Sequence, residues 1–149
     1  MMADMIADPL PEIPVVATGP DFPYETLLFD EQRAHALIDG ATRLAPRQAL
    51  KVLDRMSRRW LAKWNNPHLG EIDRIAERLG RPGAYFLSVN LEWGCTVGVH
   101  AAAAGEGARL TRVLDWRTPG LGRHIMAAKV SGAAGLFITM TGPGYTGVL

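Results

Sequence analysis

Apolar residues recur at helical spacing through the first half of this chain. The first helix is predicted from about Glu31 to Leu44, and Asp30 stands in front of it as a capping residue. Its apolar residues lie three or four positions apart, as one face of a helix requires: Ala34, Leu37, Ile38 and Ala41. We expect this face to enter the core.

Two further helices are predicted between residues 46 and 80. Pro46 suits the first turn of the longer one, which ends near Lys63. Its apolar stripe contains Leu50, Leu53, Met56, Trp60, Leu61 and Trp64. We expect both tryptophans to pack in the core, and a ligand groove lined by them is the alternative. The shorter helix carries apolar residues from Leu69 to Leu79 and ends at Gly80.

The pattern changes at Gly83 from helical spacing to strand-like runs. Strands are predicted over residues 84–91, 95–102, 109–116, 124–130 and 136–141, with a hairpin turn at residues 103–107. The last two runs are apolar at both alternating positions, which is typical of strands that are buried on both faces. A helical first half followed by a strand-rich second half indicates an α+β protein.

The chain divides into an arm, a helical segment and a sheet. Residues 1–25 contain five prolines and are predicted to be extended, with Val15 and Val16 pairing at a sheet edge. The helical segment covers residues 26–83 and the sheet residues 84–149. Five strands covered by helices on one side would leave a face bare. We therefore expect the sheet to be truncated, and the chain to be the N-terminal part of a larger protein that self-associates when expressed alone.

Composition and charge narrow the classes of protein. The 149 residues are 48% hydrophobic and 21% charged, and the net charge is +1, which gives no indication of a nucleic-acid partner. Basic residues from Arg55 to Lys63 have helical spacing, so a solvated helix face accounts for them. A single cysteine cannot form an intramolecular disulfide. The sequence has neither a signal-peptide pattern nor a membrane span, and we expect a cytoplasmic protein.

Cys95, the single cysteine, is the candidate with the most chemistry. A lone cysteine is commonly a small buried hydrophobe, and the alternative is a nucleophile. Among the histidines, His100 is five residues downstream, so strand alternation directs it to the opposite face. His124 could approach, and a cysteine–histidine pair therefore stays open.

An N-terminal amine is another base that could serve Cys95. If the bond between Gly94 and Cys95 were cut, the new α-amine, with a pKa near ~8, could take the thiol proton. Asp115 could accept a hydrogen bond from that amine, and Arg112 could place positive charge beside the thiolate. The odd separation of these two residues requires a bulge if both are to reach the thiol. An ion pair at the strand edge is the alternative role for them.

Three segments in this order resemble a known family: Asn-Leu-Glu-Trp-Gly-Cys-Thr at residues 90–96, Arg-Val-Leu-Asp-Trp at 112–116 and Gly-Tyr-Thr-Gly at 144–147. They are similar to acid ceramidase and N-acylethanolamine acid amidase, and more distantly to penicillin V acylases and bile salt hydrolases. Residues 28–33 resemble the start of the helical segment in that family. These proteins are cysteine N-terminal nucleophile (Ntn) hydrolases with an αββα sandwich.

The resemblance implies that a precursor cuts itself between Gly94 and Cys95. Cys95 would then be nucleophile and base, Asp115 would orient the amine, and Arg112 would support the thiolate. Trp116 and Tyr145 are the expected substrate contacts. The implied reaction is hydrolysis of N-acyl amides through an acyl-thioester, without a metal or another cofactor.

The chain also departs from the family pattern. Val113 stands where the family has an asparagine, and the family's later oxyanion-hole asparagine and later arginine have no counterpart up to Leu149. The implied partner is the C-terminal half of the same fold, and we expect these 149 residues alone to be inactive. The alternative is a pseudoenzyme or binding domain that presents Trp60 and Trp64 to a partner. A homo-oligomer also stays open.

Overall fold

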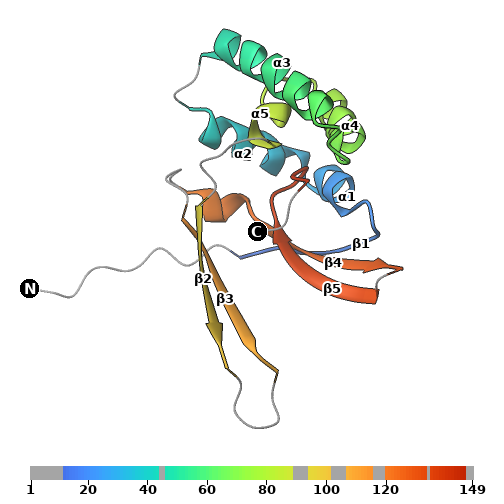
Figure 1. Ribbon diagram of the computed structural model, residues 1–149, viewed down its shortest axis with the longest axis vertical. Coiled ribbons are helices and arrows are strands. Elements are labelled where there is room, and N and C mark those ends of the chain that lie inside the picture. Colours follow the sequence, from blue (N-terminus) through green and yellow to red (C-terminus); the bar gives the residue numbers. More distant parts are fainter. Residues whose placement is uncertain are drawn as a thin grey trace, which may run out of the picture.

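The computed structural model describes residues 12–43, 46–88, 94–101, 107–115, 120–133 and 135–146. Within these ranges the protein is α+β. Its α-helices lie together at one end of the molecule, and the strands form two separate sheets (Figure 1). The helices are α1 (Phe22–Phe29), α2 (Glu31–Ala41), α3 (Arg47–Lys63), α4 (Leu69–Leu79), α5 (Ala84–Ser88) and a short 3₁₀ helix, η1 (Leu121–His124).

The predicted capped helix is confirmed as α2. The backbone N–H of Arg33 donates to Asp30 Oδ1 at 2.8 Å, which satisfies one of the unpaired amides at the helix start. Ala34, Leu37 and Ile38 are buried, as the spacing predicted. Together with Leu27 of α1, Ile75 and Leu79 of α4, and Ala84 of α5, Ala34 and Ile38 form the main apolar cluster of the helical layer.

The ends of α1 and α4 follow from proline and glycine. α1 begins at Phe22, so the extended arm expected over residues 1–25 ends earlier than predicted, because Pro23 fits the first helical turn, where no amide donor is needed. α4 ends, as predicted, at Gly80, whose φ of +60° lies in the left-handed region. Asn65, after α3, also has a positive φ of 47°.

The strand expected over residues 84–91 is wrong for residues 84–88, which form α5. This short helix packs on α3 and α4. The Gly83 amide in front of it donates to Asp54 Oδ2 of α3 at 2.7 Å, and Ser88 Oγ donates to the Ala84 carbonyl at 2.8 Å. Tertiary contact with two long helices thus overrides the β propensity of the aromatic run.

The burial expected for the tryptophans of α3 is also wrong. Trp60 and Trp64 are 54% and 64% exposed. The buried side of this helix is instead formed by Leu50, Leu61 and two polar residues, Asp54 and Ser57. The apolar stripe predicted along α3 therefore has one row in the core and another at the surface.

The strands do not form one five-stranded sheet. β1 (Val15–Thr18), β4 (Met126–Gly132) and β5 (Gly135–Thr141) form a sheet of order β1-β4-β5, in which β1 is parallel to β4 and β5 antiparallel to it. The predicted edge pairing of Val15 and Val16 is thus confirmed. β2 (Gly94–His100) and β3 (Arg109–Asp115) form a second, antiparallel pair, which extends away from the helices (Figure 1).

Burial in the sheets is uneven. Met126, Ala128 and Val130 of β4 are in the core, whereas Leu136, Phe137 and Ile138 of β5 are exposed. The apolar character of both faces of β5 therefore does not correspond to burial within the described chain.

Among the described residues, no helix is long and apolar enough to cross a bilayer.

Candidate functional site

The β2–β3 ladder determines where Cys95 and its expected companions lie. Gly94 pairs with Asp115, Cys95 with Leu114, and Val97 with Arg112. Directly opposed residues of an antiparallel pair have Cα atoms about 4.5–5.5 Å apart. The predicted hairpin strands are therefore confirmed. Cys95 and Asp115 lie at one end of the ladder, and Arg112 lies at its middle, two pairs further along than Cys95.

The ladder is regular over the seven successive pairs from Gly94 to His100, so it has no bulge at these positions. Positions on opposed strands share a face, and neighbours along a strand alternate. Cys95 and Arg112 consequently belong to the same face of the ladder, and Asp115 to the other. The bulge that the sequence required is absent from residues 94–100 and 109–115. For Cys95 and Asp115, the structure describes the position of the backbone only.

The surroundings of this ladder are open to solvent. Arg112 is exposed, and so are Val97, Val99, Leu110 and Val113, which follow the two strands. Apolar side chains exposed along both strands are typical of a surface that another part of a protein covers.

The two expected substrate contacts differ in what the structure describes. Trp116 lies outside the described residues, as do residues 90–93. Tyr145 is in the turn after β5, where its amide donates to the Gly142 carbonyl at 3.0 Å. It borders an apolar pocket between α2, α4 and α5 with a volume of about 20 Å³. That volume suits one water molecule and not an acyl chain.

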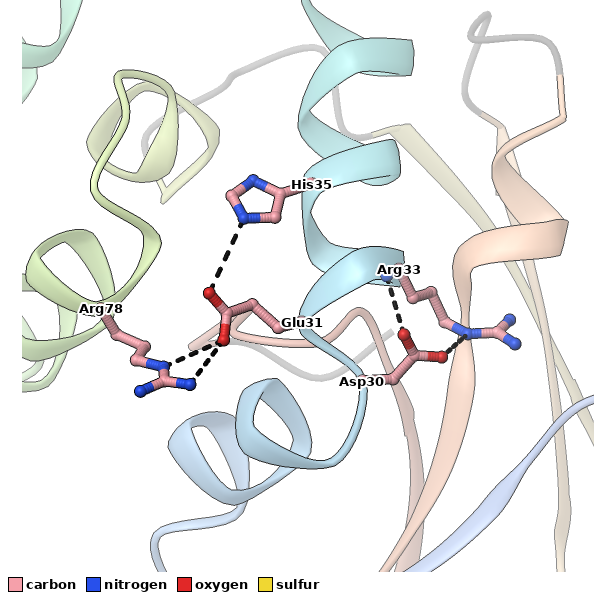
Figure 2. Close-up of polar contacts among 5 residues, drawn as sticks. All are labelled: Asp30, Glu31, Arg33, His35 and Arg78. Carbon is pink, nitrogen blue, oxygen red and sulfur yellow. Dashed lines mark hydrogen bonds and ion pairs between the residues drawn. The ribbon is translucent and has the colours of Figure 1, made fainter.

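Charged side chains at the junction of α1 and α2 form two groups, drawn in Figure 2. Glu31 Oε2 accepts from Arg78 Nη2 at 2.7 Å, and Glu31 Oε1 lies 3.8 Å from His35 Nε2. Asp30 Oδ2 accepts from Arg33 Nε at 3.0 Å. These pairs cap α2 and join it to α4, and their partners are protein groups. We therefore assign these side chains a structural role.

An open cleft between α2 and η1 was not predicted. Arg33 crosses it and donates to the Arg123 carbonyl. His124 lies beside them, in a 3₁₀ turn rather than in the strand expected for it. Burial lowers the pKa of His124, and the positive charges of Arg33 and Arg123 lower it further. Sequence spacing could not reveal this cleft, because Arg33 and Arg123 are distant in the chain.

In the part of the chain that the structure describes, no group of three or more histidine, cysteine, aspartate or glutamate side chains is arranged to hold a metal ion. Comparison with protein-family models, with curated proteins and with solved structures found no match to this chain. The likeness to N-terminal nucleophile hydrolases therefore depends on the three sequence segments that contain Cys95, Arg112 and Tyr145.

Proposed function

We propose that this chain is part of the precursor of an autoproteolytic amide hydrolase of the cysteine Ntn type, with Cys95 as its nucleophile. The observation that carries this proposal is the register of the β2–β3 ladder. In this register the Gly94–Cys95 bond lies at the start of β2, opposite Leu114 and Asp115. The Arg112 position lies on the same face of the ladder as the Cys95 position.

The register also removes the need for a bulge. The group that Asp115 must hold is the α-amine of Cys95, which is a backbone nitrogen and has no side-chain face. This nitrogen joins Cys95 to Gly94, the cross-strand partner of Asp115. Cleavage before Cys95 would therefore leave the new amine next to the Asp115 position. Arg112 would act on the thiolate from the Cys95 face, where fixed positive charge lowers a thiol pKa.

The proposed reaction follows from these positions. The amine accepts the thiol proton, and the thiolate attacks the carbonyl carbon of an N-acyl amide. The C–N bond breaks, the leaving amine takes a proton, and the acyl group stays on sulfur as a thioester. Water then adds to the thioester, which releases a carboxylic acid and restores the thiol. Donors for the developing oxyanion would come from the partner half of the fold. The loss of one such donor lowers the rate by about 10²–10³.

Cleavage of the full-length protein tests the proposal. The wild-type protein should appear as two pieces, one of them beginning at Cys95, and Cys95→Ala should remain whole because the attacking thiol is gone. Intact-mass measurement distinguishes the two. Val99→Ala, an exposed change on the same strand, is the matched control and should be cut like wild type. Cleavage that persists in Cys95→Ala would assign the cut to an outside protease and overturn the proposal.

A second candidate function is an interaction domain, with or without catalysis. The exposure of Trp60 and Trp64 on α3 favours it, because large aromatic side chains contribute most to binding when a partner buries them. This candidate does not depend on Cys95.

A further inference from the structure

α3 carries two parallel rows of side chains on its outer surface. The first row is apolar and each member is four residues from the next: Val52, Met56, Trp60 and Trp64, the C-cap residue of α3, between 52% and 64% exposed. Twelve residues of helix extend about 18 Å. α3 is also the outermost helix of the helical layer (Figure 1).

The second row is basic and lies next to the first. Its members each precede one apolar residue: Lys51, Arg55, Arg59 and Lys63, all exposed. No ion pair within the described part of the chain uses any of the four. Lys63 Nζ lies 5.5 Å from the centre of the Trp64 ring, which joins the two rows.

The fold accounts for Arg58 and Asp54 of α3 but not for this row. Arg58 binds Asp73 through two hydrogen bonds of 2.9 Å, and the acidic residue Asp54 is buried against the Gly83 amide. The outer face of α3 therefore presents positive charge with no acidic residue of its own helix beside it. The core of the helical layer is already complete on the opposite side, at Leu50 and Leu61.

We propose that the apolar and basic rows of α3 bind an amphipathic helix of a partner protein, with an acidic flank on that helix. This deepens, and rests on, the second candidate function. The spacing of four residues is that of one helix packing along another. Two tryptophans supply the anchors, and the basic row selects glutamate or aspartate on the partner.

The arrangement favours a rod-shaped partner over a flat lipid surface. The basic row borders the apolar row on one side. On the other side stand Leu53, half-buried, and Ser57, buried, which belong to the body of the protein. A partner helix that packs along the apolar row would need acidic residues only on the flank that faces the basic row. A bilayer would require the apolar row to project beyond its surroundings, with basic residues on both sides of it.

Two synthetic helical peptides with the same leucine face test the proposal, one flanked by glutamate and the other by lysine. Calorimetric titration of the protein should show that the glutamate peptide binds, and that the lysine peptide binds at least about ten-fold more weakly. Raising the salt concentration should weaken the glutamate complex. Trp60→Ala/Trp64→Ala should weaken it at least about ten-fold. Arg55→Glu/Arg59→Glu should reverse the preference in favour of the lysine peptide.

Lys129→Glu and Leu136→Ala are matched controls, because both side chains are exposed on the β1-β4-β5 sheet. Both should bind the glutamate peptide like wild type, and circular dichroism should show all variants folded. Equal binding of the two peptides would overturn the acidic partner and leave an interaction surface. Binding of phosphatidylserine vesicles or self-association through Trp60 and Trp64, without peptide binding, would assign another occupant and overturn the proposal. No binding of any probe would remove the second candidate function as well.

Discussion

Gly83 shows how one backbone position joins α2, α3 and α5. Its φ of +127° lies where residues with a side chain are strained, and a Cβ built there would be 2.6 Å from Ile38 Cγ2. Ile38 is 2% exposed and packs in the main apolar cluster of the helical layer. The Gly83 amide also donates to buried Asp54. The residue is therefore fixed by conformation, space and hydrogen bonding together.

Gly83→Ala should lower the free energy of unfolding by about 1–3 kcal/mol, since it adds backbone strain and a clash with Ile38. Urea denaturation followed by circular dichroism measures the change. Gly70→Ala is the control, because nothing lies within 4 Å of a Cβ there and the residue is inside α4. It should be neutral or stabilise by up to about 1 kcal/mol. Equal effects of the two substitutions would contradict the close approach at Gly83.

Individual residues also show how far sequence reasoning reaches. The order of strands predicted that Cys95 and Arg112 would lie on a hairpin, but only the register shows which positions share a face. In α3, apolar residues occupy several rows, so spacing alone cannot say which row is buried. The buried row contains Ser57 and Asp54, and Asp54 accepts a hydrogen bond from the Gly83 amide in front of α5. That contact is tertiary and has no signal in the sequence of the helix.

At the scale of elements, one polar cluster joins α3, α4 and α5. Arg58 Nε and Nη2 donate to the two carboxylate oxygens of Asp73, and Tyr85 Oη donates to Asp73 Oδ1 at 2.6 Å. The hydrogen bond from Arg58 lowers the pKa of Asp73. Burial, and then the hydrogen bond to Asp73, raise the pKa of Tyr85 to about 12. The cluster thus holds Asp73 charged and Tyr85 neutral.

The raised pKa of Tyr85 predicts a loss of stability in alkali. The neutral phenol is favoured in the folded state, so its contribution is complete below the ordinary value of 10.0 and is lost as the pH rises through about 12. An absorbance titration of wild type minus Tyr85→Phe should give a midpoint near 12, and the Asp73→Asn background should lower that midpoint. A Tyr85 midpoint near 10 in the folded wild-type protein would show that the cluster does not form in solution.

The difference between predicted and observed elements has a common cause. α2 and α4 have a cap or a stop in their own residues, Asp30 and Gly80, and were predicted with the correct type and nearly correct ends. α5 has neither, and its helix depends on contact with α3 and α4. Local signals therefore sufficed for α2 and α4, and failed for α5, whose structure depends on neighbouring helices.

At the scale of the whole molecule, β5 leaves apolar surface uncovered. Leu136 and Ile138 are 63% and 66% exposed, and they pair with Ser131 and Lys129 on the outer face of the sheet. β5 is also an edge of the sheet order β1-β4-β5. An exposed apolar edge strand is a template for pairing with another chain.

We therefore expect the 149-residue protein to self-associate and to bind an apolar dye. Leu136→Lys/Ile138→Lys should shift it toward the monomer in sedimentation and reduce dye fluorescence, because charge blocks edge pairing. Leu28→Lys on α1 is the control, as an exposed apolar residue away from β5 and from the two rows of α3, and should change the association little. A wild-type protein that sediments as a monomer and unfolds cooperatively would contradict this expectation.

The parallel pairing of β1 with β4 has a consequence for biosynthesis. Val15 pairs with Ala127, so roughly 110 residues separate strands that lie side by side. At 5–20 residues per second, β1 leaves the ribosome about 6–22 s before its partner is made. The sheet core therefore cannot close during that interval, whereas α1 to α4 can already pack on one another. Translation speed and chaperone binding to the waiting N-terminal strand would then decide how much of the nascent protein reaches its native topology.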